Sequence, residues 1–256
     1  MMVDCVILAG GANGELEKIE GIPNKALIKI GDKEVIRYVL EALRRVEKIE
    51  RIVLAGPVEQ FECLKGDYSL ELVPEENSLL ENLGAATRYL QTKKPLLIAT
   101  ADIPLITSEG LEDFLQKCYP YDIDFYYPIV RKEVCENSFP GVKRTFVKLE
   151  EGSFTGGNIF LVNSTIIEPN LPILKQFIDS RKKPLKMVSM LGAGFLLSGL
   201  AGRLSIAQLE KRFSGLFNLK AKAIISDYPE LGFDMDKPED LELMRRYIAD
   251  SNNEGL

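Results

Sequence analysis

The stretch that decides the fold is VDCVILAGGANGELEKIEGIPNK, at residues 3–25. Its apolar run Cys5–Leu8 stops at Ala9-Gly10-Gly11, which is typical of a buried strand followed by a glycine turn. Adjacent glycines let the backbone approach a ligand closely, and the N–H groups of such a turn can hold phosphate oxygens. Lys25 follows the loop and can supply the positive charge that a polyphosphate needs. An ordinary turn with a solvated lysine explains the same residues about equally well.

Outside this stretch, short apolar runs alternate with helical patterns as far as residue 118. We expect strands at 52–55, 70–73 and 95–100, and helices at 34–49, 79–90 and 108–118. Such alternation is typical of βαβ units, in which helices cover both faces of a parallel sheet. The sequence therefore predicts an α/β fold with three α/β/α layers and a mostly parallel central sheet.

The pattern changes after residue 121. We expect strands at 123–130, 143–149 and 158–162, a mostly helical segment at 165–215, and a last strand and helix at 221–226 and 238–249. No repeat or low-complexity linker interrupts the chain. We therefore expect a single domain over residues 1–250, with a β-rich and helical insertion around 120–220 and a frayed tail at 251–256.

The composition limits the partners and catalytic groups that the protein can have. The chain has 256 residues, of which 46% are hydrophobic and 27% are charged, as in ordinary globular proteins. A net charge of -6 argues against nucleic acid as a partner but leaves room for a local basic pocket that binds a small anion. The sequence contains no histidine, which excludes histidine bases, triads and metal ligands. A metal would need oxygen ligands, and these suit Mg²⁺.

The four cysteines are far apart in the sequence and form no CxxC motif. Cys5 and Cys118 lie in apolar patterns, and we interpret them as buried free thiols, for which a reducing cytoplasm is the simplest setting. No signal peptide is visible at the amino terminus. The most apolar window, residues 187–200, is shorter than the roughly 20 residues of a membrane span. We expect a buried helix there and no membrane partner, with a lipid-facing helix as the weaker alternative.

Two acidic stretches lie at expected element boundaries. Asp102 follows the expected strand 95–100 and would lie at the carboxyl edge of the sheet, where open α/β folds bind ligands. Taken alone, Asp102 is better explained as the cap of its own turn. Asp236 precedes Pro238 in a helix-start signature, which favours a capping role. That signature does not explain Asp234, whose side chain should point toward the strand edge.

Two weaker patterns have sufficient structural explanations. Gly156-Gly157 with Asn158 forms either a hairpin turn or a backbone that approaches a ligand, and the residues favour neither. Ser78, with Glu81 three residues later, fits a capping box at a helix start.

Four segments together resemble the MobA-like NTP transferases, which include the molybdenum-cofactor guanylyltransferases and cytidylyltransferases. They are LAGG at 8–11, NKALIKIGDKEVI at 24–36, ADIPL at 101–105 and FDMDKPEDL at 233–241. The resemblance implies a Rossmann-like, GT-A-like nucleotidyltransferase fold. It also implies Mg²⁺-dependent transfer of an NMP from an NTP to a small acceptor, with release of pyrophosphate. We favour a phosphorylated acceptor, because phosphate is already ionised at neutral pH and needs no histidine base.

The resemblance also assigns residues. It implies that Lys25 and Asp102 are catalytic and that Asp102 and Asp234 bind Mg²⁺. The nucleotide-binding residues that it implies are Leu8, Ala9, Gly10, Gly11, Lys25, Ser78, Asn82, Thr100, Gly157 and Asn158.

Two alternatives stay open. The family's glycine loop usually contains an arginine, whereas this chain has Asn13-Gly14-Glu15-Leu16, and Glu15 would repel phosphate. That departure is compatible with a nucleotide-binding protein that has lost catalysis. A GT-A-type glycosyltransferase would carry D-x-D after a middle strand, but here Asp102 is followed by Ile103-Pro104. The sequence leaves the NTP, the acceptor and the oligomeric state open.

Overall fold

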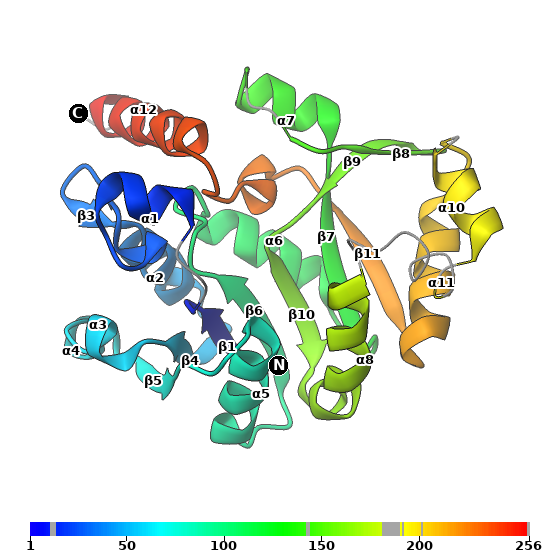
Figure 1. The fold of residues 1–256 in the computed structure, drawn as a ribbon, viewed down its shortest axis with the longest axis horizontal. Coiled ribbons are helices and arrows are strands. Elements are labelled where there is room, and N and C mark those ends of the chain that lie inside the picture. The colour runs from blue at the N-terminus through cyan, green and yellow to red at the C-terminus, as the bar shows by residue number, and fades with distance from the viewer. Residues whose placement is uncertain (11–13, 142–143, 181–189, 191, 201, 255–256) are drawn as a thin grey trace.

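The computed structural model describes residues 1–10, 14–141, 144–180, 190, 192–200 and 202–254. The strands are β1 (Val3–Leu8), β2 (Lys29–Ile30), β3 (Lys33–Glu34), β4 (Ile49–Gly56), β5 (Glu71–Pro74), β6 (Pro95–Thr100), β7 (Phe125–Arg131), β8 (Val147–Leu149), β9 (Gly152–Gly156), β10 (Ile159–Asn163) and β11 (Ala221–Ser226). Within the described residues, a nine-stranded sheet has the order β5-β4-β1-β6-β10-β7-β9-β8, and β11 pairs with β7 (Figure 1). Strands β2 and β3 form a separate ribbon.

The sheet is mostly parallel, as the sequence predicts. Strand β1 pairs in parallel with β4 and β6, β4 pairs in parallel with β5, and β7 with β11. Strand β10 runs antiparallel to β6 and β7, and β9 runs antiparallel to β7 and β8. Only β9 and β10 are therefore reversed among the nine strands of the described sheet. The carboxyl ends of β1, β4, β6 and β7 meet at one edge.

Helices cover both faces of this sheet. They are α1 (Glu15–Glu20), α2 (Val35–Arg45), α3 (Val58–Phe61), α4 (Leu64–Tyr68), α5 (Leu79–Leu90), α6 (Ser108–Cys118), α7 (Lys132–Ser138), α8 (Ile167–Ser180), α10 (Ala193–Leu200), α11 (Ile206–Phe217) and α12 (Pro238–Glu254). Short 3-10 turns are η1 (Lys25–Leu27), η2 (Ser164–Ile166) and η3 (Pro229–Gly232). The predicted three-layer architecture is confirmed.

Strand β1 shows why its sequence is apolar throughout. Cys5 and Ile7 pack into a core cluster with residues of α2 and α6, whereas Val6 and Leu8 pack on the opposite face with residues of α5. A strand that is buried on both faces needs a continuous apolar run rather than alternation. The predicted burial of Cys5 and Cys118 as free thiols is also confirmed.

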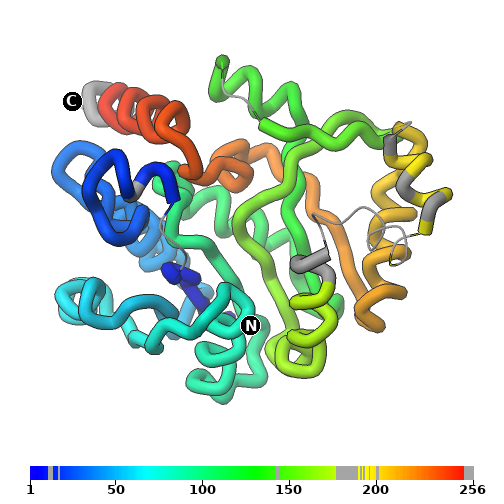
Figure 2. The backbone as a smooth tube through the Cα atoms, in the orientation of Figure 1, coloured from blue at the N-terminus to red at the C-terminus, as the bar shows by residue number. Residues whose placement is uncertain are grey.

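The second half of the chain extends the main sheet. Strands β7, β9, β10 and β11 all pair within it, and the polar segment after β7 forms helix α7. Helix α12 runs on to Glu254, beyond the predicted end at residue 249, and its backbone lies next to that of α1 (Figure 2). Arg245 on α12 forms an ion pair with Glu20 on α1.

The expected buried helix at 187–200 is only partly correct. Residues 187–189 and 191 lie outside the described residues, and α10 covers residues 193–200. Leu197 on α10 is 67% exposed, because this short helix has apolar residues on more sides than the sheet can cover. Within the described part of the chain, no helix has the length and apolar character to cross a membrane.

The central position of β1 predicts where stability is concentrated. Ile7→Ala should lower the free energy of unfolding by about 3 kcal/mol, because Ile7 is 0% exposed and its truncation leaves a cavity. Ile19→Ala is the matched control, because Ile19 on α1 is 59% exposed and its loss should change stability by no more than about 0.5 kcal/mol. Urea unfolding measures both variants. Equal losses would contradict the placement of β1.

Candidate active site

Backbone hydrogen bonds bring distant segments together at the carboxyl edge of the sheet. The amide of Ala101 donates to Leu8 O at 3.2 Å, and the amide of Thr100 donates to Asn158 O at 3.2 Å. One further bond, from the amide of Met235 to Asp102 O at 2.9 Å, fixes the loop before α12 against the end of β6. The ends of β1 and β6, the start of β10 and the loop before α12 therefore surround one place.

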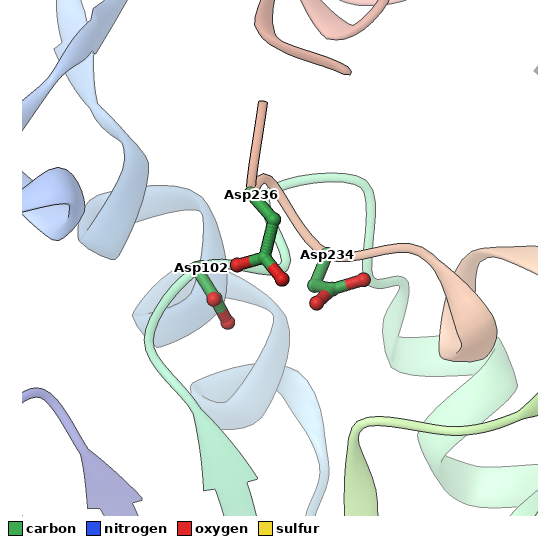
Figure 3. A group of neighbouring side chains, drawn as sticks. All are labelled: Asp102, Asp234 and Asp236. Carbon is green, nitrogen blue, oxygen red and sulfur yellow. The ribbon is translucent and has the colours of Figure 1, made fainter. Parts of the chain in front are cut away.

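Three carboxylates converge there (Figure 3). One oxygen from each of Asp102, Asp234 and Asp236 lies within 4.8 Å of the other two. The side chain of Asp102 is 9% exposed and that of Asp236 is 57% exposed, so the cluster reaches from the interior to the surface. Oδ1 of Asp102 is buried and has no hydrogen-bond partner among the described residues. A buried carboxylate oxygen of this kind is costly unless it meets a cation or a donor.

Lys25 lies between two of these carboxylates. Its Nζ contacts Asp102 and lies 2.7 Å from Oδ1 of Asp236. Asn24 fixes the lysine's position: its Oδ1 accepts from the amide of Ala26 at 2.9 Å, and its Nδ2 donates to Ala9 O at 2.6 Å. The 3-10 turn that carries Lys25 is therefore tied to the end of β1.

Arg144 balances the third carboxylate. Its Nη1 contacts Oδ1 of Asp234, and its Nη2 donates to Asp234 O at 2.9 Å. The guanidinium also lies 4.5 Å from the ring centroid of Phe233, and the arginine side chain is 14% exposed. Arg144 is thus a largely buried cation that is held by the residues before α12.

The pKa values reflect this crowding. Burial raises the pKa of Asp234, and the charges of Asp102 and Asp236 raise it further, in spite of Arg144. Burial acts to raise the pKa of Asp236, but the hydrogen bond and charge of Lys25, a hydrogen bond with Asp234 and the charge of Arg144 together leave that pKa below its usual value. Burial alone would lower the pKa of Lys25, yet the two carboxylates raise it. Lys25 is therefore fully charged, and the cluster holds excess negative charge.

The glycine loop borders the start of α5. A Cβ atom at Gly10 would lie 2.3 Å from Nδ2 of Asn82 and 2.7 Å from Oε1 of Glu75, so a larger residue at position 10 would displace these two side chains. Oδ1 of Asn82 accepts from the amide of Glu76 at 2.6 Å. Asn82 therefore holds the loop after β5 beside the end of β1. Gly11 lies outside the described residues.

The remaining predicted residues divide into two kinds. Ser78 accepts from the amide of Glu81 at 3.3 Å as the N-cap of α5, which is the structural explanation offered by the sequence. A Cβ atom at Gly157 would lie 2.7 Å from Cγ of Pro128, so this glycine serves packing between strands. By contrast, Oγ1 of Thr100 and Nδ2 of Asn158 are buried without a hydrogen-bond partner in the described part of the chain. These two polar atoms remain free for a ligand.

The structure gives Asp236 and Arg144 a larger part in the site than the sequence alone indicates. The sequence favours a capping role for Asp236, but its carboxylate contacts Lys25, while Oδ2 of Asp240 accepts from the amides of Asp236 and Lys237. Arg144 falls within the segment 143–149, where a strand was expected, but it lies before β8. No local sequence pattern predicts the contact of Arg144 with Asp234, which is 90 residues away in the sequence.

The ion pairs of Lys25 predict how its replacement changes the free energy of unfolding and how that change depends on pH. Lys25→Met should lower the free energy of unfolding by about 2 kcal/mol at pH 7, because the buried Asp102 loses its cation. The pKa of Asp236 is lowered by folding, so its pair contributes stability above an unfolded pKa of about 3.9 and loses it as the pH falls through the folded pKa. The deficit should therefore shrink near pH 3.

A divalent cation should replace the missing lysine charge. In thermal unfolding, Mg²⁺ should raise the midpoint of Lys25→Met more than that of the unmodified protein. Lys65→Met is the matched control, because Lys65 on α4 forms only an exposed pair with Glu62. An equal response to Mg²⁺ in all three proteins would contradict a cation site at these carboxylates.

Comparison with known proteins agrees with this geometry. Residues 5–169 match the MobA-like NTP transferase domain. The solved structure of a hypothetical transferase from Thermus thermophilus is 36% identical, with a TM-score of 0.83 over 94% of this chain and 100% of that chain. No curated protein matches the chain at a significant level.

Two more distant solved structures share the fold. CMP:2-keto-3-deoxy-manno-octonic acid synthetase, complexed with CTP, is 14% identical, with a TM-score of 0.62 over 98% of this chain and 100% of that one. The 4-diphosphocytidyl-2C-methyl-D-erythritol synthase from Anaerococcus prevotii is 11% identical, with a TM-score of 0.62 over 97% and 98%. The match over residues 5–169 and the 36% identical structure show that the chain belongs to the MobA-like NTP transferases, a family of nucleotidyltransferases.

Proposed function

We propose that the protein is a Mg²⁺-dependent nucleotidyltransferase that moves an NMP from an NTP to a small phosphorylated acceptor and releases pyrophosphate. The observation that carries this proposal is the carboxylate cluster of Asp102, Asp234 and Asp236, with Lys25 beside it and the Gly10 turn at the same edge. We take residues 1–250 as one catalytic domain. The buried free thiols suit a reducing compartment such as the cytoplasm.

The donor set fits Mg²⁺. Three carboxylates offer oxygen ligands within 4.8 Å of one another, and Oδ1 of Asp102 lacks a protein partner among the described residues. Asp102 and Asp234 would hold the ion, and the exposed Asp236 would join them. Bound there, Mg²⁺ would neutralise charge on the phosphate oxygens of the NTP.

The chain's own residues supply the positioning. The turn at Ala9, Gly10 and Gly11 would hold the β- and γ-phosphates through the amides of the two glycines, because the amide of Ala9 already donates to Ala55 O at 2.9 Å. Lys25 would turn from the carboxylates to the α-phosphate, where negative charge develops during transfer. Asn82, Thr100 and Asn158 would contact the ribose and base, which is supported by the two free polar atoms of Thr100 and Asn158.

The reaction then requires alignment rather than a base. An acceptor phosphate oxygen would attack the α-phosphorus and form the new P–O bond, while the bond to the β-phosphate oxygen breaks and pyrophosphate leaves. Arg144, a largely buried cation beside Asp234, is placed to hold the acceptor phosphate. The acceptor oxygen is already ionised, so no proton has to be removed.

The alternatives have weaker support. The Asp122 and Asp124 pair, which could suggest a glycosyltransferase, precedes β7 at the opposite end of that strand. Asp124 accepts there from Nδ2 of Asn163 and the amide of Lys220. Glu15, which motivates the inactive alternative, is exposed at the start of α1. A protein without catalysis would bind an NTP with Mg²⁺ and release no pyrophosphate.

Pyrophosphate release tests the proposal directly. The protein is incubated with Mg²⁺, each common NTP in turn and a mixture of small phosphorylated metabolites. CTP is tried first, because the synthetase of the same fold was solved with CTP. We expect pyrophosphate and a nucleotidylated product with one NTP. NTP binding without pyrophosphate would instead support the inactive alternative.

Asp102→Asn should lower kcat/KM about 10²–10³-fold and raise the Mg²⁺ concentration that gives half-maximal activity. The variant removes a carboxylate worth several kcal/mol of charge stabilisation. Asp227→Asn is the matched control, because the Asp227 side chain is 78% exposed and has only a 3.9 Å contact with Lys117. An unaltered Mg²⁺ dependence in Asp102→Asn would remove this residue from the metal site.

Gly10→Ala should raise the KM for the NTP about tenfold. The new methyl group would displace Nδ2 of Asn82, which lies 2.3 Å from its position, and disturb the phosphate turn. Gly66→Ala is the matched control, because the added Cβ would meet no atom within 4 Å on α4. A KM equal to that of the unmodified enzyme would show that the turn does not contact the NTP.

A further inference from the structure

A large apolar pocket lies in the second half of the chain. Its volume is about 460 Å³, between the face of β7–β11 and helices α10 and α11. Its lining includes Phe125, Tyr127, Phe160, Phe195, Leu209 and Phe213. Pockets of about 300–1,000 Å³ with apolar and aromatic walls are typical of small-molecule sites.

Aromatic rings that stack on one another line the pocket. The rings of Phe125 and Phe160 stack with centroids 5.8 Å apart, Phe125 and Phe213 at 5.2 Å, and Tyr127 and Phe160 at 5.4 Å. Protein interiors are normally packed without voids of this size. Aromatic side chains that are fixed by one another and still border open space are suited to an apolar ligand.

Strand β9 connects this pocket to the carboxylates. Thr155 and Gly156 line the pocket, and a Cβ atom at Gly156 would lie 1.6 Å from the hydroxyl of Tyr127. A Cβ atom at Gly232 would lie 3.1 Å from Cγ2 of Thr155, so the loop that leads to Asp234 packs against the same strand, on the face opposite the pocket. Burial raises the pKa of Tyr127, and the nearby charge of Asp234 raises it further.

The outer wall is also apolar. Helix α10 contributes Phe195 to the lining, and its sequence AGFLLSGL contains no charged residue. Leu197 on the same helix is 67% exposed. Glu210, Arg212 and Lys222 also border the pocket, but most of its lining is apolar. Such a lining suits a hydrocarbon chain better than a sugar or a pterin, because polar groups would lose their hydrogen bonds to water there.

We propose that the acceptor is an alkyl or prenyl phosphate whose apolar chain lies in this pocket while its phosphate lies at Arg144 and the carboxylate cluster. This inference rests on the proposed nucleotidyl transfer and names its substrate class. The phosphate oxygen forms the new bond to the α-phosphorus and pyrophosphate leaves, so the hydrocarbon chain is bound and is not changed.

The test is a series of n-alkyl phosphates, from ethyl to octyl, as acceptors with the preferred NTP and Mg²⁺. Each buried CH₂ group should raise kcat/KM about fourfold. Calorimetric binding of octyl phosphate should show a negative heat-capacity change, which ethyl phosphate should lack. Rates and binding that do not depend on chain length would overturn the proposal.

A matched pair of variants locates the chain. Ala223→Phe places a ring in the pocket and should remove the dependence on chain length, whereas the KM for the NTP should stay unchanged and thereby show that the variant is folded. Ala207→Phe on the exposed side of α11 should behave as the unmodified protein. Chain-length dependence that persists in a folded Ala223→Phe variant would overturn the pocket assignment.

The two proposals can fail separately. Transfer to short phosphates with no preference for longer chains would overturn the pocket assignment and leave nucleotidyl transfer standing. Chain-dependent binding of octyl phosphate without any pyrophosphate release would overturn the proposed function, and with it the role of the pocket as an acceptor site. A change of oligomeric state in Ala223→Phe, without loss of chain-length dependence, would indicate a contact between copies and overturn the pocket assignment.

Discussion

The contact of Lys25 with Asp102 and Asp236 is the interaction on which the rest of the site depends. Asp102 is nearly buried, and its charge could not remain there without a cation. The lysine joins three segments: the turn after the glycine loop, the end of β6 and the loop before α12. Asn24 also donates a hydrogen bond to the end of β1. The need of one buried carboxylate for a cation therefore holds together a site whose parts are far apart in the sequence, since Lys25 and Asp236 are separated by 211 residues.

The two halves of the sheet carry different parts of the proposed site. Parallel strands β5, β4, β1 and β6 bring the glycine turn, Asn82 and Asp102 to one edge, which is the phosphate side of the proposed site. Strands β9 and β10 run opposite to their neighbours, so the connection between them lies at that edge. There the carbonyl of Asn158 accepts from the amide of Thr100 at the end of β6. The same reversal leaves the apolar pocket on the neighbouring face, so donor and acceptor would meet where the strand direction changes.

Much of the site could be predicted, because its parts follow strands. Asp102 comes directly after an apolar run, and the carboxyl ends of parallel strands share an edge, so its meeting with the turn at Gly10 was expected. The ranking of the two later aspartates was less successful, because Asp236 has a helix-start pattern that accounts for it locally. Gly157 shows the converse: its glycine is required by contact with Pro128, and a sequence pattern cannot separate packing from ligand approach.

The sequence by itself determined the layered α/β architecture, the glycine turn and the family, since each depends on local periodicity or on short motifs in a fixed order. Only the tertiary structure decided that Asp236 joins Lys25, that Arg144 pairs with Asp234, and that aromatic residues of several strands and helices line one pocket. Those features are contacts between residues far apart in the chain. Their energies depend on burial and on the distance between charges, and neither quantity is encoded in any local pattern.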